Sequence, residues 1–181
     1  MGEPTLHAPV LRVLAVTTRH SAALEWTREK TTAAWGPVAL TSETFDFSQT
    51  DYYANTMGPG LGKTFLAYAL LSDAADVADW KFQANAWEEE YAALGQHEEP
   101  RPLNLDPGYI TPAKLVLAST KDHAHRMYLG RGMYAEITLY FKHRQWQAHD
   151  FTFPDYRRPE YHEFFNRCRQ ELRERSAGLG S

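Results

Sequence analysis

The sequence predicts a single α+β domain built on an antiparallel sheet. One observation is an amphipathic helix over 73–94, where apolar residues recur every three or four positions. A second is a β-hairpin in which residues 127–129 and 133–135 flank the loop Gly130-Arg131-Gly132. A third is the order strand, helix, strand, strand, helix, strand over residues 10–105. This order predicts a ferredoxin-like βαββαβ core, extended by a short helix, the hairpin and a C-terminal helix.

The first half of the chain alternates apolar segments with turn signals. Residues 10–17 are almost continuously apolar, which predicts a central, buried strand. Residues 21–35 predict a helix that stops at Gly36-Pro37. Extended segments follow over 38–47 and 63–71, and the turn-rich connection between them has room for one helical turn.

The glycine-rich stretch before the second of these strands resembles a phosphate-binding P-loop only superficially. The motif requires a glycine where the chain has Met57, and it requires a helix after Thr64 rather than a strand. The stretch from Gly58 to Gly62 therefore predicts an ordinary turn.

The segment 102–119 contains the clearest turn signal. Asp106-Pro107-Gly108 is typical of a type II turn, because proline fixes φ and glycine accepts the positive φ of the third position. Thr111-Pro112 then predicts the start of a short helix over 114–119, although a strand is the alternative for so short an apolar run. Helix N-termini favour negative charge, so Asp106 either shapes the turn itself or lies beside an anionic ligand.

The hairpin register places Tyr128 opposite Tyr134, and Arg126 opposite Glu136. One face then carries polar and aromatic residues, namely Arg126, Tyr128, Tyr134, Glu136, Thr138 and Tyr140. The other face is apolar and is expected in the core, with Met127, Leu129, Met133, Ala135, Ile137, Leu139 and Phe141. The polar face is either a solvated surface with ordinary cross-strand pairs or a platform for a ligand.

The last third of the chain predicts a strand over 147–153 and a helix that opens at Pro159. Cys168 lies on the apolar stripe of that helix, which favours a core position over a catalytic one. The domain is expected to span 1–175, followed by a flexible tail over 176–181.

Composition narrows the class of protein. Apolar residues make up 43% of the chain, and the net charge of −4 argues against non-specific nucleic-acid binding as the main activity. The single cysteine excludes an intrachain disulfide. No secretory signal and no apolar run of about 18 residues is present, so we expect a soluble cytoplasmic protein without a membrane partner.

Candidate functional side chains gather around the hairpin start. The expected proton-transfer groups are Asp106, His125 and Glu136, and the expected ligand-binding groups are Lys121, Asp122, Arg126 and Tyr128, with Asp46 and Asp155 as outer candidates. In this hypothesis Arg126 and Lys121 hold an anion, His125 transfers a proton, and a carboxylate orients it. No metal site is predicted, because no third ligand is fixed by spacing beside His123 and His125.

Several short motifs occur in matching order along almost the whole chain. They are Phe45-Asp46-Phe47, Asp51-Tyr52-Tyr53, Met57-Gly58, Asn104-Leu-Asp-Pro-Gly-Tyr109, Lys114-Leu-Val-Leu-Ala118, His125-Arg-Met-Tyr-Leu-Gly130, Gly132-Met-Tyr-Ala-Glu136, Pro154-Asp-Tyr156 and Phe164-Phe165. In these motifs the chain resembles an uncharacterised prokaryotic family, domain of unknown function 4416. The resemblance implies a single small cytosolic domain, and it implies no activity, cofactor or catalytic residue.

Two functions follow as hypotheses. The first is a small enzyme or binding protein for a phosphorylated or nucleotide-like ligand. The second is a non-catalytic interaction module whose aromatic, partly basic hairpin face binds a protein or RNA partner. Substrate, cofactor, metal dependence, pathway and oligomeric state stay open at the level of sequence.

Overall fold

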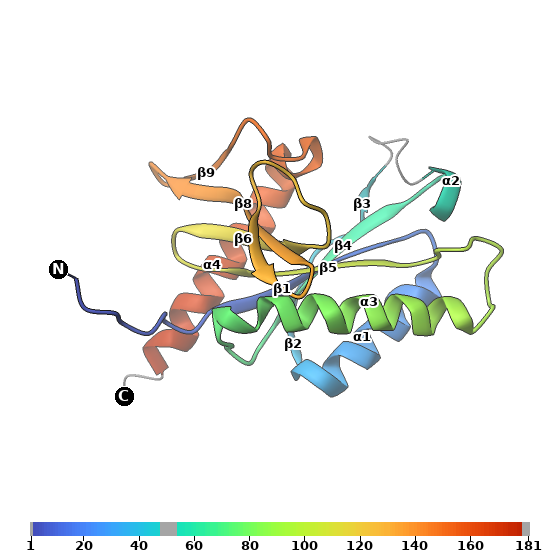
Figure 1. Cartoon of the computed structure of the whole chain (residues 1–181), viewed down its shortest axis with the longest axis horizontal. Coiled ribbons are helices and arrows are strands. Elements are labelled where there is room, and N and C mark those ends of the chain that lie inside the picture. The colour runs from blue at the N-terminus through green and yellow to red at the C-terminus, as the bar shows by residue number, and fades with distance from the viewer. Residues whose placement is uncertain (1, 48–53, 179–181) are drawn as a thin grey trace.

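The structure is a computed structural model that describes residues 2–47 and 54–178 (Figure 1). In chain order its elements are β1 (Leu11–Thr18), α1 (Ser21–Trp35), β2 (Val38–Thr41), β3 (Phe45–Asp46), α2 (Ala54–Met57), β4 (Gly62–Tyr68), η2 (Ala74–Asp76), α3 (Val77–Ala93), β5 (Asn104–Ile110), β6 (Lys114–Ser119), β7 (Met127–Gly130), β8 (Met133–Lys142), β9 (Gln145–Ala148), η3 (Pro154–Arg157) and α4 (Pro159–Gly178). The α+β class is confirmed.

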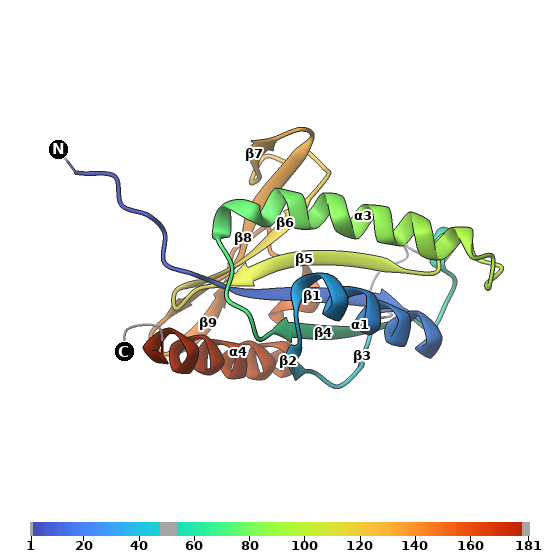
Figure 2. The same cartoon turned by 90° about the horizontal axis from the view of Figure 1, so that it is seen from below.

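All nine described strands form one antiparallel sheet. Its order is β2-β4-β1-β5-β6-β8-β7, with β3 added beside β4 and β9 beside β8. Helices α1 and α3 lie side by side along the strands (Figure 1). The β7–β8 hairpin extends past α3 at one end of the sheet (Figure 2).

Both faces of the central strand are covered, as its continuous apolar run predicts. Val13 and Ala15 of β1 pack into the core that includes Phe165 of α4. Leu14 and Val16 of β1 point the other way, into the core formed with α1 and α3. Side chains alternate across a strand, so an apolar residue at every position requires a layer on each side.

The predicted helices over 21–35 and 73–94 are confirmed in position. Trp80 and Trp87 are buried on the apolar stripe of α3, and Asp79 and Glu89 are exposed on its other side. An amphipathic helix predicts that Glu88 is exposed as well, but only 11% of its side chain is accessible.

The short helix predicted over 114–119 is wrong, because this segment is strand β6 between β5 and β8. The hydroxyl of Thr111 accepts hydrogen bonds from the backbone N–H groups of Ala113 and Lys114, at 3.1 and 3.0 Å. The N–H of Thr111 in turn donates to the carbonyl of Lys114 at 2.9 Å. The same side-chain chemistry that caps a helix therefore closes the tight turn between β5 and β6.

The predicted type II turn at Asp106 is also wrong, because residues 106–108 lie inside β5. Gly108 does not have positive φ. It is required for a different reason, since a Cβ there would lie 2.1 Å from the carbonyl oxygen of Val116 on β6. The glycine allows the two backbones to approach closely.

The hairpin register is confirmed, and its two predicted faces are not. Tyr128 pairs with Tyr134 across β7 and β8. Glu136 is nevertheless buried, at 2% exposure, while Met127 and Leu129 are 62% and 42% exposed. A β-bulge in the β6–β8 pairing shifts the alternation, and β7 is the edge strand.

The C-terminal third differs from the prediction in its strand. The strand predicted over 147–153 is the shorter β9, and η3 follows it. Helix α4 begins at Pro159 as expected, buries Cys168 and reaches Gly178. Residues 179–181 of the predicted tail, and the predicted connection at Asp51-Tyr52-Tyr53, lie outside the described residues. Over the described ranges, no helix is both long and apolar enough to cross a membrane.

Candidate functional site

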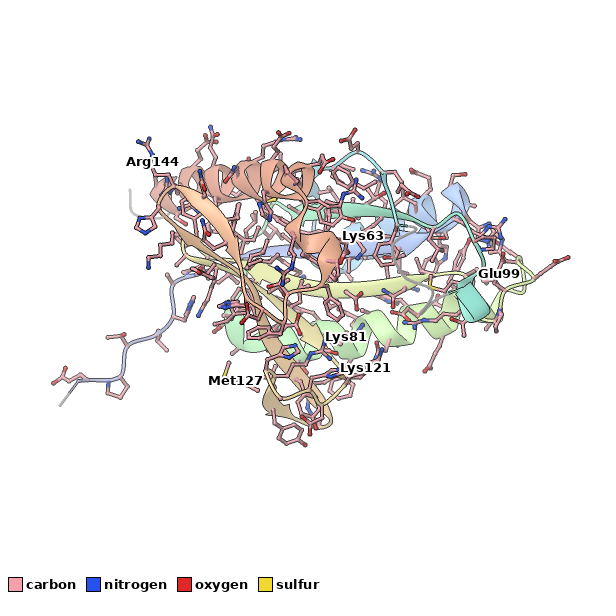
Figure 3. All side chains as sticks on the ribbon, turned by 90° about the horizontal axis from the view of Figure 1, so that it is seen from above. Lys63, Lys81, Glu99, Lys121, Met127 and Arg144 are labelled. Atoms are coloured by element: carbon pink, nitrogen blue, oxygen red, sulfur yellow. The ribbon has the colours of Figure 1, made fainter. Side chains whose placement is uncertain are left out.

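The candidate site lies where β5 and β6 separate. The two strands pair only through Gly108–Ile110 of β5, so its first residues, 104–106, have no partner on β6. A pocket of about 510 Å³ is lined by this part of the sheet, α3, the loop after β6, and η3. Its charged lining residues are Lys63, Lys81, Arg101, Lys121, Arg126, Asp106, Glu136 and Asp155. Lys63, Lys81 and Lys121 lie in the same central region of the molecule (Figure 3).

Helix α3 supplies the backbone partners that β6 does not. The ammonium of Lys81 donates to the carbonyl of Leu105 at 2.6 Å. The N–H of Leu105 donates to Oε1 of Glu88 at 2.7 Å. Unpaired backbone groups are costly to bury, so these two side chains make the separation of the strands possible and hold the pocket open.

Asp106 is the carboxylate at the centre of this arrangement. Its Oδ1 accepts from Lys81 Nζ at 3.0 Å, and its Oδ2 accepts from the amide of Asn104 at 2.7 Å. Burial alone raises the pKa of Asp106, but the charges of Lys81 and Lys63 and these hydrogen bonds outweigh it, so the pKa lies below its ordinary value. Because 31% of the side chain is exposed, the ionised carboxylate can meet a ligand.

Glu88 continues the chain of charges behind Asp106. Its Oε2 accepts a hydrogen bond from Arg101 Nη2 at 2.8 Å, and the same guanidinium also donates to Oδ1 of Asn104. Burial is the largest influence on Glu88 and raises its pKa, against the opposing charges of Lys81 and Arg101. Carboxylate and cation therefore alternate from Asp106 through Lys81 and Glu88 to Arg101, which also lines the pocket.

A second ion pair joins β4 to η3. Lys63 Nζ lies 2.5 Å from Oδ2 of Asp155, and both residues are more than 90% buried. The ammonium also lies 3.9 Å from the ring centroid of Phe47 and 5.0 Å from that of Tyr156. Burial, and then the carboxylate of Asp155, raises the pKa of Tyr156 well above its ordinary value, so its phenol stays protonated.

A third pair comes from the hairpin. Arg126 Nε donates to Oε2 of Glu136 at 2.7 Å, and its Nη1 donates to the hydroxyl of Ser119 at 2.7 Å. His125 Nε2 lies 3.0 Å from the same carboxylate oxygen. Glu136 thus fixes the orientation of both neighbours.

The lining carries five cations, Lys63, Lys81, Arg101, Lys121 and Arg126, and three carboxylates, Asp106, Glu136 and Asp155. Adding Glu88 behind Arg101 still leaves one positive charge in excess, in a chain whose net charge is −4. Buried ion pairs contribute little stability, because desolvation of the charges offsets their attraction. Several such pairs around one cavity are therefore typical of a functional site.

The chain matches the model of a family described as domain of unknown function (DUF4416) over residues 8–172. It belongs to this family. The DUF4416 match spans every residue that lines the pocket. No curated protein and no solved structure matches the chain.

The DUF4416 pocket brings together some of the residues that the sequence predicts and leaves others aside. Asp106, Lys121, Arg126, Glu136 and Asp155 line it. The predicted residues that do not line it are Asp46, Asp122, His125 and Tyr128. Two of these make hydrogen bonds elsewhere. His125 Nε2 is hydrogen-bonded to Oε2 of Glu136, and the backbone carbonyl of Asp46 accepts a hydrogen bond from Arg158.

Sequence reasoning did not identify Lys63, Lys81 or Asn104 as site residues. One signal was available, because Lys81, Asn85 and Glu88 recur at helical spacing beside the apolar stripe of α3. A polar stripe at that place indicates a helix face that meets polar groups in the interior. No comparable signal marked Lys63 at the start of an otherwise apolar strand.

Of the two histidines in the loop before β7, His123 lines the pocket and His125 does not. The rings of His123 and His125 stack, with centroids 5.8 Å apart. Throughout 2–47 and 54–178, no three His, Cys, Asp or Glu side chains come together as ligands for a metal ion.

Proposed function

We propose that this DUF4416 protein binds a small phosphorylated ligand in the pocket between β5 and β6, as a small enzyme or as a binding protein. The observation that carries the proposal is the excess of cations over carboxylates around one pocket. Lys63, Lys81 and Arg126 enter it from β4, α3 and the hairpin, so no single loop movement would disperse them. Positive groups held on rigid elements are what binding of a phosphate requires.

The carboxylates among the cations support a ligand that also donates hydrogen bonds. Asp106 is kept ionised by Lys81 and Lys63 and is open to the pocket, so it can accept a ligand hydroxyl or take its proton. Glu136 holds Arg126 in place, and His125 acts on the site only through that same carboxylate. A sugar phosphate or nucleotide combines hydroxyl donors with phosphate acceptors.

A thermal-shift screen against inorganic phosphate, sugar phosphates and nucleotides tests the proposal, because a ligand that binds the folded state raises the melting temperature. Lys121→Glu reverses an exposed charge on the pocket lining and should weaken binding at least tenfold without unfolding the protein. Lys142→Glu reverses an exposed charge outside the lining and is the matched control. A screen without any phosphorylated hit, or equal weakening by both variants, would contradict the proposal.

A second candidate function is an interaction module, favoured by the exposed hairpin. Met127, Tyr128 and Leu129 on the edge strand β7 are 62%, 63% and 42% exposed. Such side chains can contact a protein or stack on RNA bases. Binding of a labelled single-stranded RNA, lost in Tyr128→Ala and kept in Lys121→Glu, would favour this function over the first.

We also propose that the fold contains the ferredoxin-like core that the sequence predicts. Its support is the local order β2-β4-β1-β5, all antiparallel, with α1 and α3 contributing to one shared core. This is the order that two interleaved βαβ units give. An experimental structure in which β4 does not lie between β1 and β2 would contradict it.

A further inference from the structure

We infer that the ligand of this pocket is a nucleoside phosphate whose base stacks on Phe153 and hydrogen-bonds to Asn85. The inference rests on the proposed function and deepens it, because it names the second half of the ligand. Three features of the lining carry it: an aromatic face open to the pocket, a side-chain amide without a hydrogen-bond partner, and a tyrosine hydroxyl that is accessible from the pocket.

The aromatic face belongs to Phe153. It lines the pocket, yet it is 47% exposed, in contrast to Phe47 and Tyr156 on the same lining, which are 7% and 3% exposed. Its backbone is held in an extended conformation immediately before Pro154 at the start of η3. The guanidinium of Arg126 lies 6.0 Å from its ring centroid. A fixed phenyl face beside an arginine is a common platform for nucleobases.

The second feature is the side-chain amide of Asn85. It lies one helical turn after Lys81 on α3, and both side chains line the pocket. Unlike the amide of Asn104, which joins Arg101 to Asp106, the amide of Asn85 has no hydrogen-bond partner among the described residues. An amide donates and accepts together, which suits the edge of a base better than a phosphate, which only accepts.

The third feature is the hydroxyl of Tyr156. The residue is 3% exposed and lines the pocket, and its hydroxyl makes no hydrogen bond to any residue in the described ranges. Because this hydroxyl is not one of the fully buried unpartnered atoms of the described residues, it is accessible from the pocket and can hydrogen-bond to a ligand there. Because the phenol stays protonated, it donates to an oxygen of the sugar or phosphate.

These features and the ion pairs offer different contacts to the two parts of a nucleotide. Lys63 and Lys81 act on Asp106, where the phosphate and sugar would lie. Phe153 offers its ring to the base and lies beside Arg126. A volume of about 510 Å³ is in the range of pockets that enclose whole cofactor-sized ligands rather than a single phosphate.

Isothermal titration calorimetry with AMP, GMP, CMP and UMP, compared with ribose 5-phosphate, tests the inference. At least one nucleotide should bind about tenfold or more tightly than ribose 5-phosphate, because stacking of one base contributes roughly that much. Phe153→Ala should abolish this preference and leave the affinity for ribose 5-phosphate within about twofold, while Phe153→Trp should retain it. Asn85→Ala should reduce the affinity for the preferred base by about fivefold or more.

Phe151→Ala is the control, because Phe151 is a similarly exposed phenylalanine, at 41%, that does not line the pocket. If ribose 5-phosphate binds as tightly as every nucleotide, or if Phe153→Ala leaves the preference intact, the inference is overturned and the proposed function stands. If neither ribose 5-phosphate nor any nucleotide binds while another phosphorylated compound raises the melting temperature, the inference is overturned and the proposed function stands; if no phosphorylated compound binds, both fail. If the alanine variant unfolds, Phe153→Leu replaces it, because leucine keeps most of the apolar volume without the aromatic ring and should also abolish the preference for the nucleotide.

Discussion

Replacing Lys81 with methionine tests whether the buried charges hold the pocket open. Methionine keeps the length and apolar stem of lysine, so the change removes the ammonium and little else. It removes the donor to Leu105 O at 2.6 Å and to Asp106 Oδ1 at 3.0 Å. Glu88, whose Oε1 lies 3.9 Å from the ammonium, loses its neighbouring cation as well.

The expected loss in free energy of unfolding is about 3 kcal/mol. Breaking a buried ion pair from one side costs about 3–5 kcal/mol, because the remaining charge is left without compensation. Here the remaining carboxylate of Asp106 is 31% exposed and keeps its bond from Asn104, so the lower end of that range applies. Urea unfolding at pH 7 measures the loss, with the exposed Lys142→Met as the control that should change stability by less than about 0.5 kcal/mol.

The pH dependence provides an independent check of the cause. Since the pKa of Asp106 is lowered in the folded protein, its ionised form contributes stability above about pH 3.8, and this contribution is lost as the pH falls through the folded-state pKa. Without Lys81 the pKa of Asp106 rises, so the stability difference between Lys81→Met and the parent protein should narrow as the pH falls from 7 and the carboxyl group becomes protonated. A gap that is constant with pH, or a loss below about 1 kcal/mol, would refute the reasoning.

Three further predictions concern the fold. Gly108→Ala should destabilise by about 1–3 kcal/mol in urea, because its Cβ would overlap the Val116 carbonyl; stability equal to the parent would show that β5 and β6 are not so close. Trp87→Ala should lower the free energy of unfolding by about 3–5 kcal/mol, since Trp87 is 6% exposed and its ring centroid lies 4.9 Å from that of Trp35. A loss under about 1 kcal/mol would contradict that packing. Cys168 should react with a thiol reagent only in the unfolded protein, because burial raises its pKa; rapid labelling at pH 8 without denaturant would show otherwise.

Local elements were predictable wherever the sequence pattern and the environment agree. The helix over 21–35, the stripe of Trp80 and Trp87, and the register of Tyr128 against Tyr134 all follow from spacing within a few residues. The 106–108 segment shows where such reasoning fails. Proline and glycine have the same turn signature whether glycine supplies a positive φ or merely space for a neighbouring strand, and only the neighbour decides between them.

The candidate site also contains contacts that the sequence predicts and contacts that only the tertiary structure shows. The sequence by itself determined the α+β class, the central strand, and the pairing of Arg126 with Glu136, because these depend on residues that are near in the chain or alternate along it. Only the tertiary structure decided that Lys63 meets Asp155 and that Lys81 meets Leu105 and Asp106. Those contacts join residues 92, 24 and 25 positions apart. The contact of Lys81 with Leu105 arises because an open stretch of β5 must have its backbone groups satisfied from another layer of the fold.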